Sequence, residues 1–237
     1  MSLFYRSVAL PTRWAFRLGC PEVRIEGAEN VPRSGPFLVL PNHESILDPF
    51  FLLSFSPRPL SAMTKSTQFT HQGARWGLER LLAFPVRRYR TDAQAVRVVL
   101  RALRAGKGVC IYPEGERTWD GALQPFRRGT LRLMLGAGVP IIPCGMEGLY
   151  DLWPRWASRP RRGVPIVLRF GEPLHFGPFE SRQARDAALP AAGTLLRERI
   201  LELSGEARRR ESWEDEDRML DELAMPEAES PSLSAGS

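Results

Sequence analysis

The chain has 237 residues, of which 43% are hydrophobic and 25% are charged, a balance typical of a globular protein rather than a collagen-like or wholly disordered chain. It contains no run of 18 apolar residues that could cross a bilayer as a helix. Arg6, Arg13 and Arg17 interrupt the apolar N-terminus, which is unlike a signal peptide. Three widely spaced cysteines indicate neither a disulfide framework nor a zinc site, so we expect a reducing compartment.

The net charge of +6 is distributed unevenly. Residues 206–237 carry ten acidic and four basic side chains, so the rest of the chain has a net charge of +12. A basic body favours anionic partners such as nucleic acid, anionic lipid or phosphorylated substrates. The Glu, Asp, Ser and Pro content of residues 206–237 predicts a mostly disordered tail.

Residues 1–20 are expected to form a separate N-terminal segment. Residues 3–18 predict a short amphipathic helix interrupted by Pro11. Phe4, Trp14 and Phe16 lie among arginines in this segment, as suits a helix at a membrane interface. A helix packed on the domain is the alternative.

Residues 21–205 predict a single α/β domain, because apolar runs of strand length alternate with helical patterns. An apolar stripe at Val96, Val99, Leu100 and Leu103 predicts a helix with Asp92 as its N-cap. The other expected elements are strands at 37–40, 109–112, 139–143 and 164–170, and helices beginning near Leu52, at 130–137 and at 183–203, the last broken or kinked at Pro190.

A first polar cluster follows the expected strand at 37–40. His43 has the side chain best suited to act as a general base near neutral pH, and Asp48 could orient its ring. Five residues apart on one regular helix, these side chains would diverge. They can act together only if His43 lies in a loop and Asp48 lies at or near the helix start, as Pro41 and Pro49 suggest. The alternative is that Asp48 only caps the helix.

A second polar cluster, Glu114, Gly115, Glu116 and Arg117, follows the strand at 109–112. Gly115 permits a tight turn, and the guanidinium of Arg117 suits a phosphate. Glu114 could bind a substrate hydroxyl or hold Arg117. Sites in open α/β sheets lie beyond the carboxyl ends of strands, so both clusters are candidates for one active site. A solvated turn with a surface ion pair is the alternative for this cluster.

Together, Asn42-His43-x4-Asp48 and Pro113-Glu114-Gly115-x-Arg117, about seventy residues apart, resemble the glycerolipid acyltransferase family, typified by 1-acylglycerol-3-phosphate acyltransferases. The stretches 84–88, 126–129 and 139–143 resemble further blocks of that family. The resemblance covers roughly residues 25–175. It implies a mixed, largely parallel central sheet flanked by helices, as in glycerol-3-phosphate acyltransferases.

The resemblance also implies a reaction and roles for individual residues. A fatty acyl group moves from acyl-CoA or acyl-carrier protein to the free hydroxyl of a lysophospholipid, 1-acylglycerol-3-phosphate first of all, in phospholipid biosynthesis. His43 and Asp48 are the catalytic pair, and the expected substrate-binding residues are Lys65, Arg88 (with Arg87 as the fallback), Glu114, Gly115 and Arg117. The acyl donor is a substrate, and we expect neither a cofactor nor a metal. Cys110 and Cys144 are expected to be buried strand residues with no role in the chemistry.

The sequence departs from the family pattern at two positions of these blocks. Glu116 stands where Thr or Ser is commoner, and a carboxylate there would repel a phosphate unless it faces away. Leu82 stands where the second block usually has its leading glycine. The N-terminal membrane region is also only a short helix. We expect peripheral attachment to the inner face of the cell membrane from the cytoplasm, through that helix or a basic-aromatic stretch at 153–162.

Three other functions remain open from the sequence. The basic body would suit a nucleic-acid-binding protein, but no such motif is present and both polar clusters would be unexplained, so we expect no nucleic-acid partner. A hydrolase, or an acyltransferase for another lipid hydroxyl such as a lipid A precursor or a glycosylated lipid, would use the same base. A non-catalytic lipid-binding member of the family is the third.

Overall fold

The computed structural model describes residues 3–86 and 93–206. These residues belong to one compact unit that extends to Glu206. The expectations for Arg87, Arg88, Asp92 and residues 207–237 lie outside the described residues.

A seven-stranded sheet forms the centre of this unit, in the order β1-β7-β6-β2-β5-β3-β4. The pairing of β6 with β7 is antiparallel and the other neighbours run parallel, which confirms the predicted fold class. The strands are β1 (Val23–Glu26), β2 (Phe37–Pro41), β3 (Leu60–Lys65), β4 (Ala83–Val86), β5 (Gly108–Cys110), β6 (Ile141–Glu147) and β7 (Ile166–Phe170).

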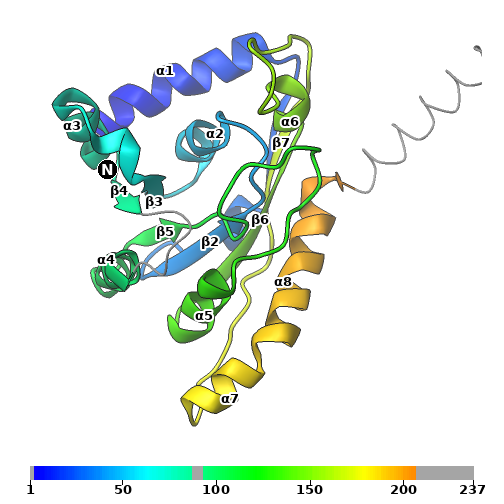
Figure 1. The fold of residues 1–237 in the computed structure, drawn as a ribbon. Coiled ribbons are helices and arrows are strands. Elements are labelled where there is room, and N and C mark those ends of the chain that lie inside the picture. The colour runs from blue at the N-terminus through cyan, green and yellow to red at the C-terminus, as the bar shows by residue number, and fades with distance from the viewer. Residues whose placement is uncertain (1–2, 87–92, 207–237) are drawn as a thin grey trace, which may run out of the picture. The chain divides into compact units, whose positions relative to one another are not determined.

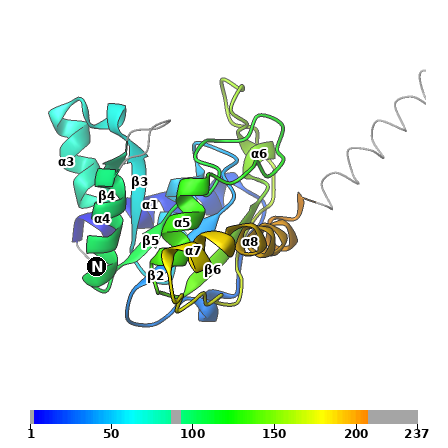
Figure 2. The same ribbon diagram turned by 60° about the horizontal axis from the view of Figure 1, so that its bottom comes forward.

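Helices cover both faces of the sheet (Figures 1 and 2). One hydrophobic core includes side chains from α1 (Leu3–Gly19), α2 (Asp48–Phe55) and α6 (Leu149–Leu152). The other includes side chains from α4 (Ala93–Arg104), α5 (Arg128–Gly136) and α8 (Leu189–Ser204). The remaining elements are η1 (Ala28–Asn30), η2 (Ser66–Phe69), α3 (Gln72–Arg80) and α7 (Arg182–Ala187).

Strand β2 shows why a continuous apolar run marks a central strand. Phe37 and Val39 enter one core, while Leu38 and Leu40 enter the other. Both faces of a parallel sheet are covered, so neither set of side chains can be polar. The sequence analysis did not predict β1, β3 and β4. Strands β1 and β4 are the four-residue edge strands, and β4 contains Pro85, which an edge strand tolerates. Strand β3 mixes polar and apolar residues (LSAMTK) and lacks the continuous apolar run of β2.

The structure corrects two expectations for the N-terminal helix α1. Helix α1 continues through Pro11 without interruption and packs along α2, and such packing can offset the backbone hydrogen bond that a proline removes. Phe16, expected at a membrane interface, is buried against Phe51 and Phe55 instead.

In α4, the buried face differs from the predicted one, because it includes Ala95 in place of Val96. The buried side chains are Ala95, Val99 and Leu103, while Val96 is exposed. Ala95, Val99 and Leu103 are spaced four residues apart, so they share one face of the helix. The predicted break at Pro190 is confirmed, since α7 ends at Ala187 and α8 begins with that proline in its first turn.

Candidate active site

The two polar clusters meet at the carboxyl ends of neighbouring strands. Strand β2 runs into the loop of His43, and β5, paired beside it, runs into the loop of Glu114. The backbone N–H of His43 donates to Oε1 of Glu114 at 2.7 Å, and the N–H of Thr118 donates to the carbonyl of His43 at 2.9 Å. The expectation that both clusters belong to one site agrees with this geometry.

His43 and Asp48 form a buried pair. Nδ1 of His43 lies 2.7 Å from Oδ2 of Asp48, and the two residues are 7% and 0% exposed. His43 lies in the loop, and Asp48 is the first residue of α2, followed by Pro49, as the spacing required. When Nδ1–H donates to the carboxylate, the lone pair of Nε2 is left to accept a proton from a substrate.

Asp48 also organises the loop before the helix. Its carboxylate accepts the backbone N–H of Glu44 at 2.6 Å and that of Ser45 at 2.9 and 3.0 Å. The alternative that Asp48 only caps the helix is wrong, because Leu47 is the N-cap without a side-chain cap hydrogen bond and the accepted N–H groups precede the helix. The catalytic role of Asp48 stays a prediction. The same hydrogen bonds that fix the loop fix the position of the imidazole.

Glu114 lies beneath this loop and is 2% exposed. Its second oxygen accepts the N–H of Gln124 at 2.8 Å, so both carboxylate oxygens accept backbone protons. Burial raises the pKa of Glu114 to about 8, although these two hydrogen bonds oppose the shift. Gly115, with φ of +79°, makes the turn that follows. The carboxylate positions the loop here, and its contact with a substrate hydroxyl stays a prediction.

Two arginines that the sequence analysis did not assign to the site bind the loop around Arg117. Arg127, the N-cap of α5, lies 2.8 Å from Oε1 of Glu116 and donates through Nε to the carbonyl of Glu114 at 3.0 Å. Arg155 donates to the carbonyl of Arg117 at 3.0 Å, lies 3.5 Å from Oε2 of Glu116 and stacks on Trp119. The resemblance of residues 126–129 to a family block was the sequence feature that could have indicated Arg127.

Two further residues complete the surroundings of His43. The side chain of Asn42 exchanges two hydrogen bonds with the backbone of Met146, at 2.7 and 2.8 Å, and so ties the end of β2 to β6. Tyr112 stacks on the imidazole, with ring centroids 3.9 Å apart. The sequence analysis included Asn42 in the motif with His43 but assigned it no role, and no sequence pattern indicated Tyr112.

The structure does not place the side chains of two predicted substrate-binding residues, Arg88 and Lys65, at the site. Arg88 lies outside the described residues. Lys65 ends β3, which pairs with β5, so its backbone lies at the same edge of the sheet as the loop of Arg117. Their binding roles stay predictions.

The cysteines lie in the core. Cys110 and Cys144 are 2% and 0% exposed, and burial raises the pKa of both thiols. Their expected place as buried strand residues is confirmed. A thiol kept neutral is a poor nucleophile.

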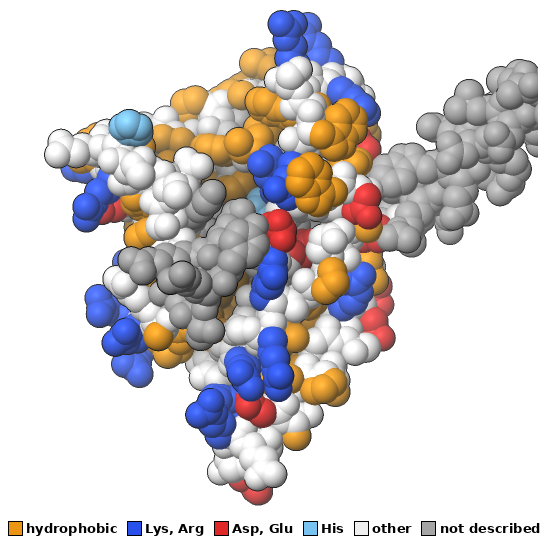
Figure 3. Space-filling model, in the orientation of Figure 1, with side chains coloured by type: hydrophobic (Ala, Val, Ile, Leu, Met, Phe, Trp, Pro, Cys, Tyr) orange, Lys and Arg blue, Asp and Glu red, His pale blue; other side chains and the backbone are white. Residues whose placement is uncertain are grey.

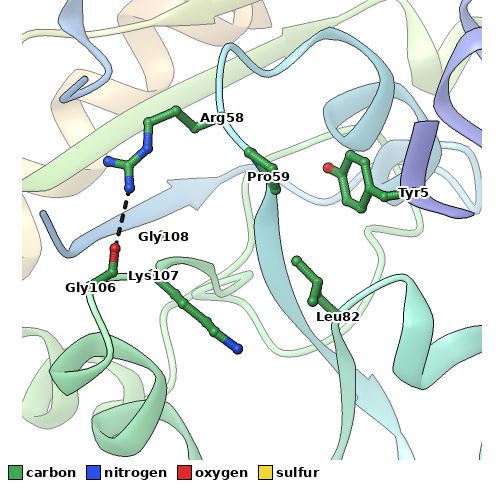
Figure 4. A pocket seen from close by; sticks show the side chains of 7 residues that line it. All are labelled: Tyr5, Arg58, Pro59, Leu82, Gly106, Lys107 and Gly108. Atoms are coloured by element: carbon green, nitrogen blue, oxygen red, sulfur yellow. Dashed lines mark hydrogen bonds between the residues drawn. The ribbon is translucent and has the colours of Figure 1, made fainter. Parts of the chain in front are cut away.

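A cavity of about 250 Å³ lies away from these residues (Figure 4). Pro59 and Gly108 line it at the starts of β3 and β5, together with Arg58 and Leu82. His43, in contrast, follows the end of β2. The cavity and the His43–Asp48 pair therefore lie at opposite ends of the strands.

A family model described as Acyltransferase matches residues 22–147, and the chain belongs to that family. It is 26% identical to the 1-acyl-sn-glycerol-3-phosphate acyltransferase of Bacillus subtilis, over 76% of this chain and 87% of that protein. It is 32% identical to the human 1-acyl-sn-glycerol-3-phosphate acyltransferase alpha, over 55% of this chain and 47% of that protein.

A chloroplast 1-acyl-sn-glycerol-3-phosphate acyltransferase of Brassica napus is 29% identical over 55% of this chain, which spans 38% of that protein. Among solved structures, the 1-acyl-sn-glycerophosphate (LPA) acyltransferase PlsC of Thermotoga maritima superposes with a TM-score of 0.67 and 25% identity, over 82% of this chain and 78% of that one. The chain thus spans less than half of the human and Brassica relatives and most of the two bacterial proteins.

Proposed function

We propose that this protein transfers a fatty acyl group from a thioester, acyl-CoA or acyl-carrier protein, to the free hydroxyl of 1-acylglycerol-3-phosphate in phospholipid biosynthesis. The observation that carries the proposal is the 2.7 Å contact between His43 and Asp48 beside the loop of Arg117. The names of the bacterial relatives support the same acceptor.

In the proposed reaction, Nε2 of His43 removes the proton of the acceptor hydroxyl while its oxygen attacks the thioester carbonyl. Asp48 stabilises the imidazolium that forms. The tetrahedral intermediate then collapses, the carbon–sulfur bond breaks, and the proton passes to the departing thiolate. The products are an ester and a free thiol, and no acyl-enzyme is required because the donor already carries a good leaving group.

The acceptor's phosphate is assigned to the basic groups around this edge of the sheet. Arg117, Arg88 and Lys65 are the proposed phosphate-binding residues. A guanidinium can bind two phosphate oxygens at once, which suits Arg117 and Arg88 to this role.

We also propose that the protein works at a membrane surface, on its cytoplasmic face, because its substrates are amphiphilic. Within the described ranges, no helix is long and apolar enough to span a bilayer. One face of α1 exposes Leu10, Trp14 and Leu18. Phe50 of α2, two residues after Asp48, is also exposed. Hydrophobic side chains gather along the upper part of the face in Figure 3, where Figure 1 places α1 and α2. An apolar helix face flanked by arginines suits interfacial binding.

Liposome flotation tests the membrane proposal. Trp14→Glu should reduce the fraction of protein that floats with vesicles containing anionic lipid. Val96→Glu is the matched control, because Val96 is exposed on α4, which packs in the other core. Equal flotation of Trp14→Glu and wild type would contradict docking through α1.

The reaction is tested with purified protein, lysophosphatidic acid and palmitoyl-CoA or palmitoyl-carrier protein. Thiol release and acylated lipid should appear together, and His43→Ala should lower the rate by about 10²–10⁴-fold. Thiol release without acylated lipid would indicate a hydrolase or another acceptor. No turnover with either donor would contradict the proposed function.

A further inference from the structure

We propose that Glu116 is a positioning residue for the acceptor site, which it serves by holding Arg127 and Arg155 against the loop that carries Arg117. The inference rests on the proposed function and names the residues that give that loop its shape. The sequence led us to expect that a carboxylate at this position would repel a phosphate unless it faces away, and the inference gives this carboxylate a supporting role instead.

The first argument is the charge balance around Glu116. Its carboxylate lies 2.8 Å from Nη2 of Arg127 and 3.5 Å from Nη1 of Arg155. One negative charge is therefore surrounded by two positive charges, so this cluster of three side chains remains net positive. A phosphate approaching Arg117 meets an excess of positive charge rather than an isolated carboxylate.

The second argument is that both arginines also bind the backbone on either side of Glu116. Arg127 donates to the carbonyl of Glu114, and Arg155 donates to the carbonyl of Arg117, each at 3.0 Å. A guanidinium can make such contacts together because its five N–H groups diverge in a fixed plane. Glu116 therefore orients two side chains that hold the turn at both ends.

The third argument is that these arginines come from separate parts of the fold. Arg127 is the N-cap of α5, and Arg155 lies in the loop after α6. The guanidinium of Arg155 lies over the ring of Trp119, 3.8 Å from its centroid. The carbonyl of Trp119 also accepts the hydroxyl of Tyr150 at 3.1 Å. The loop is thus braced from two directions, and Glu116 is the side chain common to both braces.

Steady-state kinetics with lysophosphatidic acid test this role, because the two interpretations of Glu116 predict opposite changes of KM in Glu116→Gln. Glu116→Gln keeps the shape of the side chain and removes its charge. If the carboxylate positions the loop, KM for lysophosphatidic acid rises about fivefold while kcat changes by less than about twofold, because an oriented charged hydrogen bond is lost away from the reacting atoms. If the carboxylate repels phosphate, KM falls instead, which would overturn the inference.

Arg155→Gln supplies a second measurement. Acting through the same contact, it should raise KM in the same direction, and the Glu116→Gln/Arg155→Gln double variant should raise KM by less than the product of the single effects. A full product would overturn the proposed coupling. Glu22→Gln is the matched control, since it removes a half-exposed carboxylate paired with Arg24 just before β1.

The wild-type assay separates the two proposals. Acylated product from wild type, with KM unchanged or lowered in Glu116→Gln, overturns only the role of Glu116. No acylated product from wild type with either thioester donor overturns the proposed function and this inference with it. Thermal unfolding of each variant identifies a KM change that comes from global destabilisation, and an equal rise of KM in Arg155→Lys would show that the planar guanidinium is required.

Discussion

The phenol ring of Tyr112 stacks on the imidazole of His43, with ring centroids 3.9 Å apart and planes inclined by 22°. Asp48 fixes one edge of the imidazole and Tyr112 covers one of its faces. The ring of the proposed base is therefore held in both direction and plane. Tyr112 reaches it from the end of β5, next to the strand that carries His43.

Tyr112→Leu should lower kcat about tenfold. An aromatic pair contributes about 0.5–1.5 kcal/mol beyond its burial, and about 1.4 kcal/mol corresponds to a factor of ten in rate. Tyr112→Phe keeps the stacked ring and should retain most of the activity. Single-turnover rates across pH 6–9 make the comparison, and equal losses in both variants would assign the effect to the hydroxyl instead.

Asp48→Asn should lower kcat by about 10²–10⁴-fold, because the amide no longer stabilises the imidazolium. Stability should also fall by about 1–3 kcal/mol, since the side-chain NH2 would face backbone N–H donors of Glu44 and Ser45. Rates measured well below the unfolding midpoint separate the two effects. Asp186→Asn, which weakens an ion pair with Arg132, is the control and should leave kcat unchanged.

Glu114 should make the free energy of unfolding depend on pH. Its pKa is about 8 in the folded protein against an ordinary value of 4.5, so the folded state binds the proton more tightly. The resulting stability is fully present below about pH 4.5 and is lost as pH rises toward 8, with a slope of up to about 1.4 kcal/mol per pH unit.

Urea unfolding at pH 5, 6, 7 and 8 measures this dependence. Glu114→Gln has no charge to titrate and should show a smaller slope than wild type, although one backbone N–H then faces an amide NH2. Parallel curves for the two proteins would contradict a raised pKa at Glu114.

Leu82 should be less costly to replace by glycine than its neighbour Leu81. Among the described residues other than glycine, Leu82 alone has a positive φ, +62°, a conformation that costs an L-residue about 1–2 kcal/mol and glycine almost nothing. Leu81, with φ of −82°, has a similar exposure. Chemical unfolding should find Leu82→Gly more stable than Leu81→Gly by about 1 kcal/mol, and the reverse order would contradict the strain.

The positive φ of Leu82 gives a structural reason for the glycine that is usual at this position of the block. Glycine is usual at this point of the resembling block, and the structure places the residue there in the left-handed region. This chain places a leucine in a backbone conformation that glycine adopts most easily. The sequence alone shows a leucine in place of the usual glycine, and the structure shows that this leucine has a positive φ.

The sequence by itself determined the α/β class, the central strands and the pairing of His43 with Asp48. These features depend on local properties: β2 is apolar throughout because both of its faces are buried, and the spacing of His43 and Asp48 works only across a loop and a helix start. It could not supply the edge strands β1 and β4 or the neighbouring β3, whose mixed polar and apolar sequences acquire their conformation by pairing with neighbours.

The tertiary structure alone decided which side chains surround His43 and the loop of Glu116. Tyr112 meets His43, and Arg155 meets Glu116, because strands and loops distant in sequence come together at one edge of the sheet. A single sequence records residue types and spacings along the chain, whereas these contacts depend on the order of strands in the sheet. The same order makes Glu116, expected to repel a phosphate unless it faces away, the partner of two arginines.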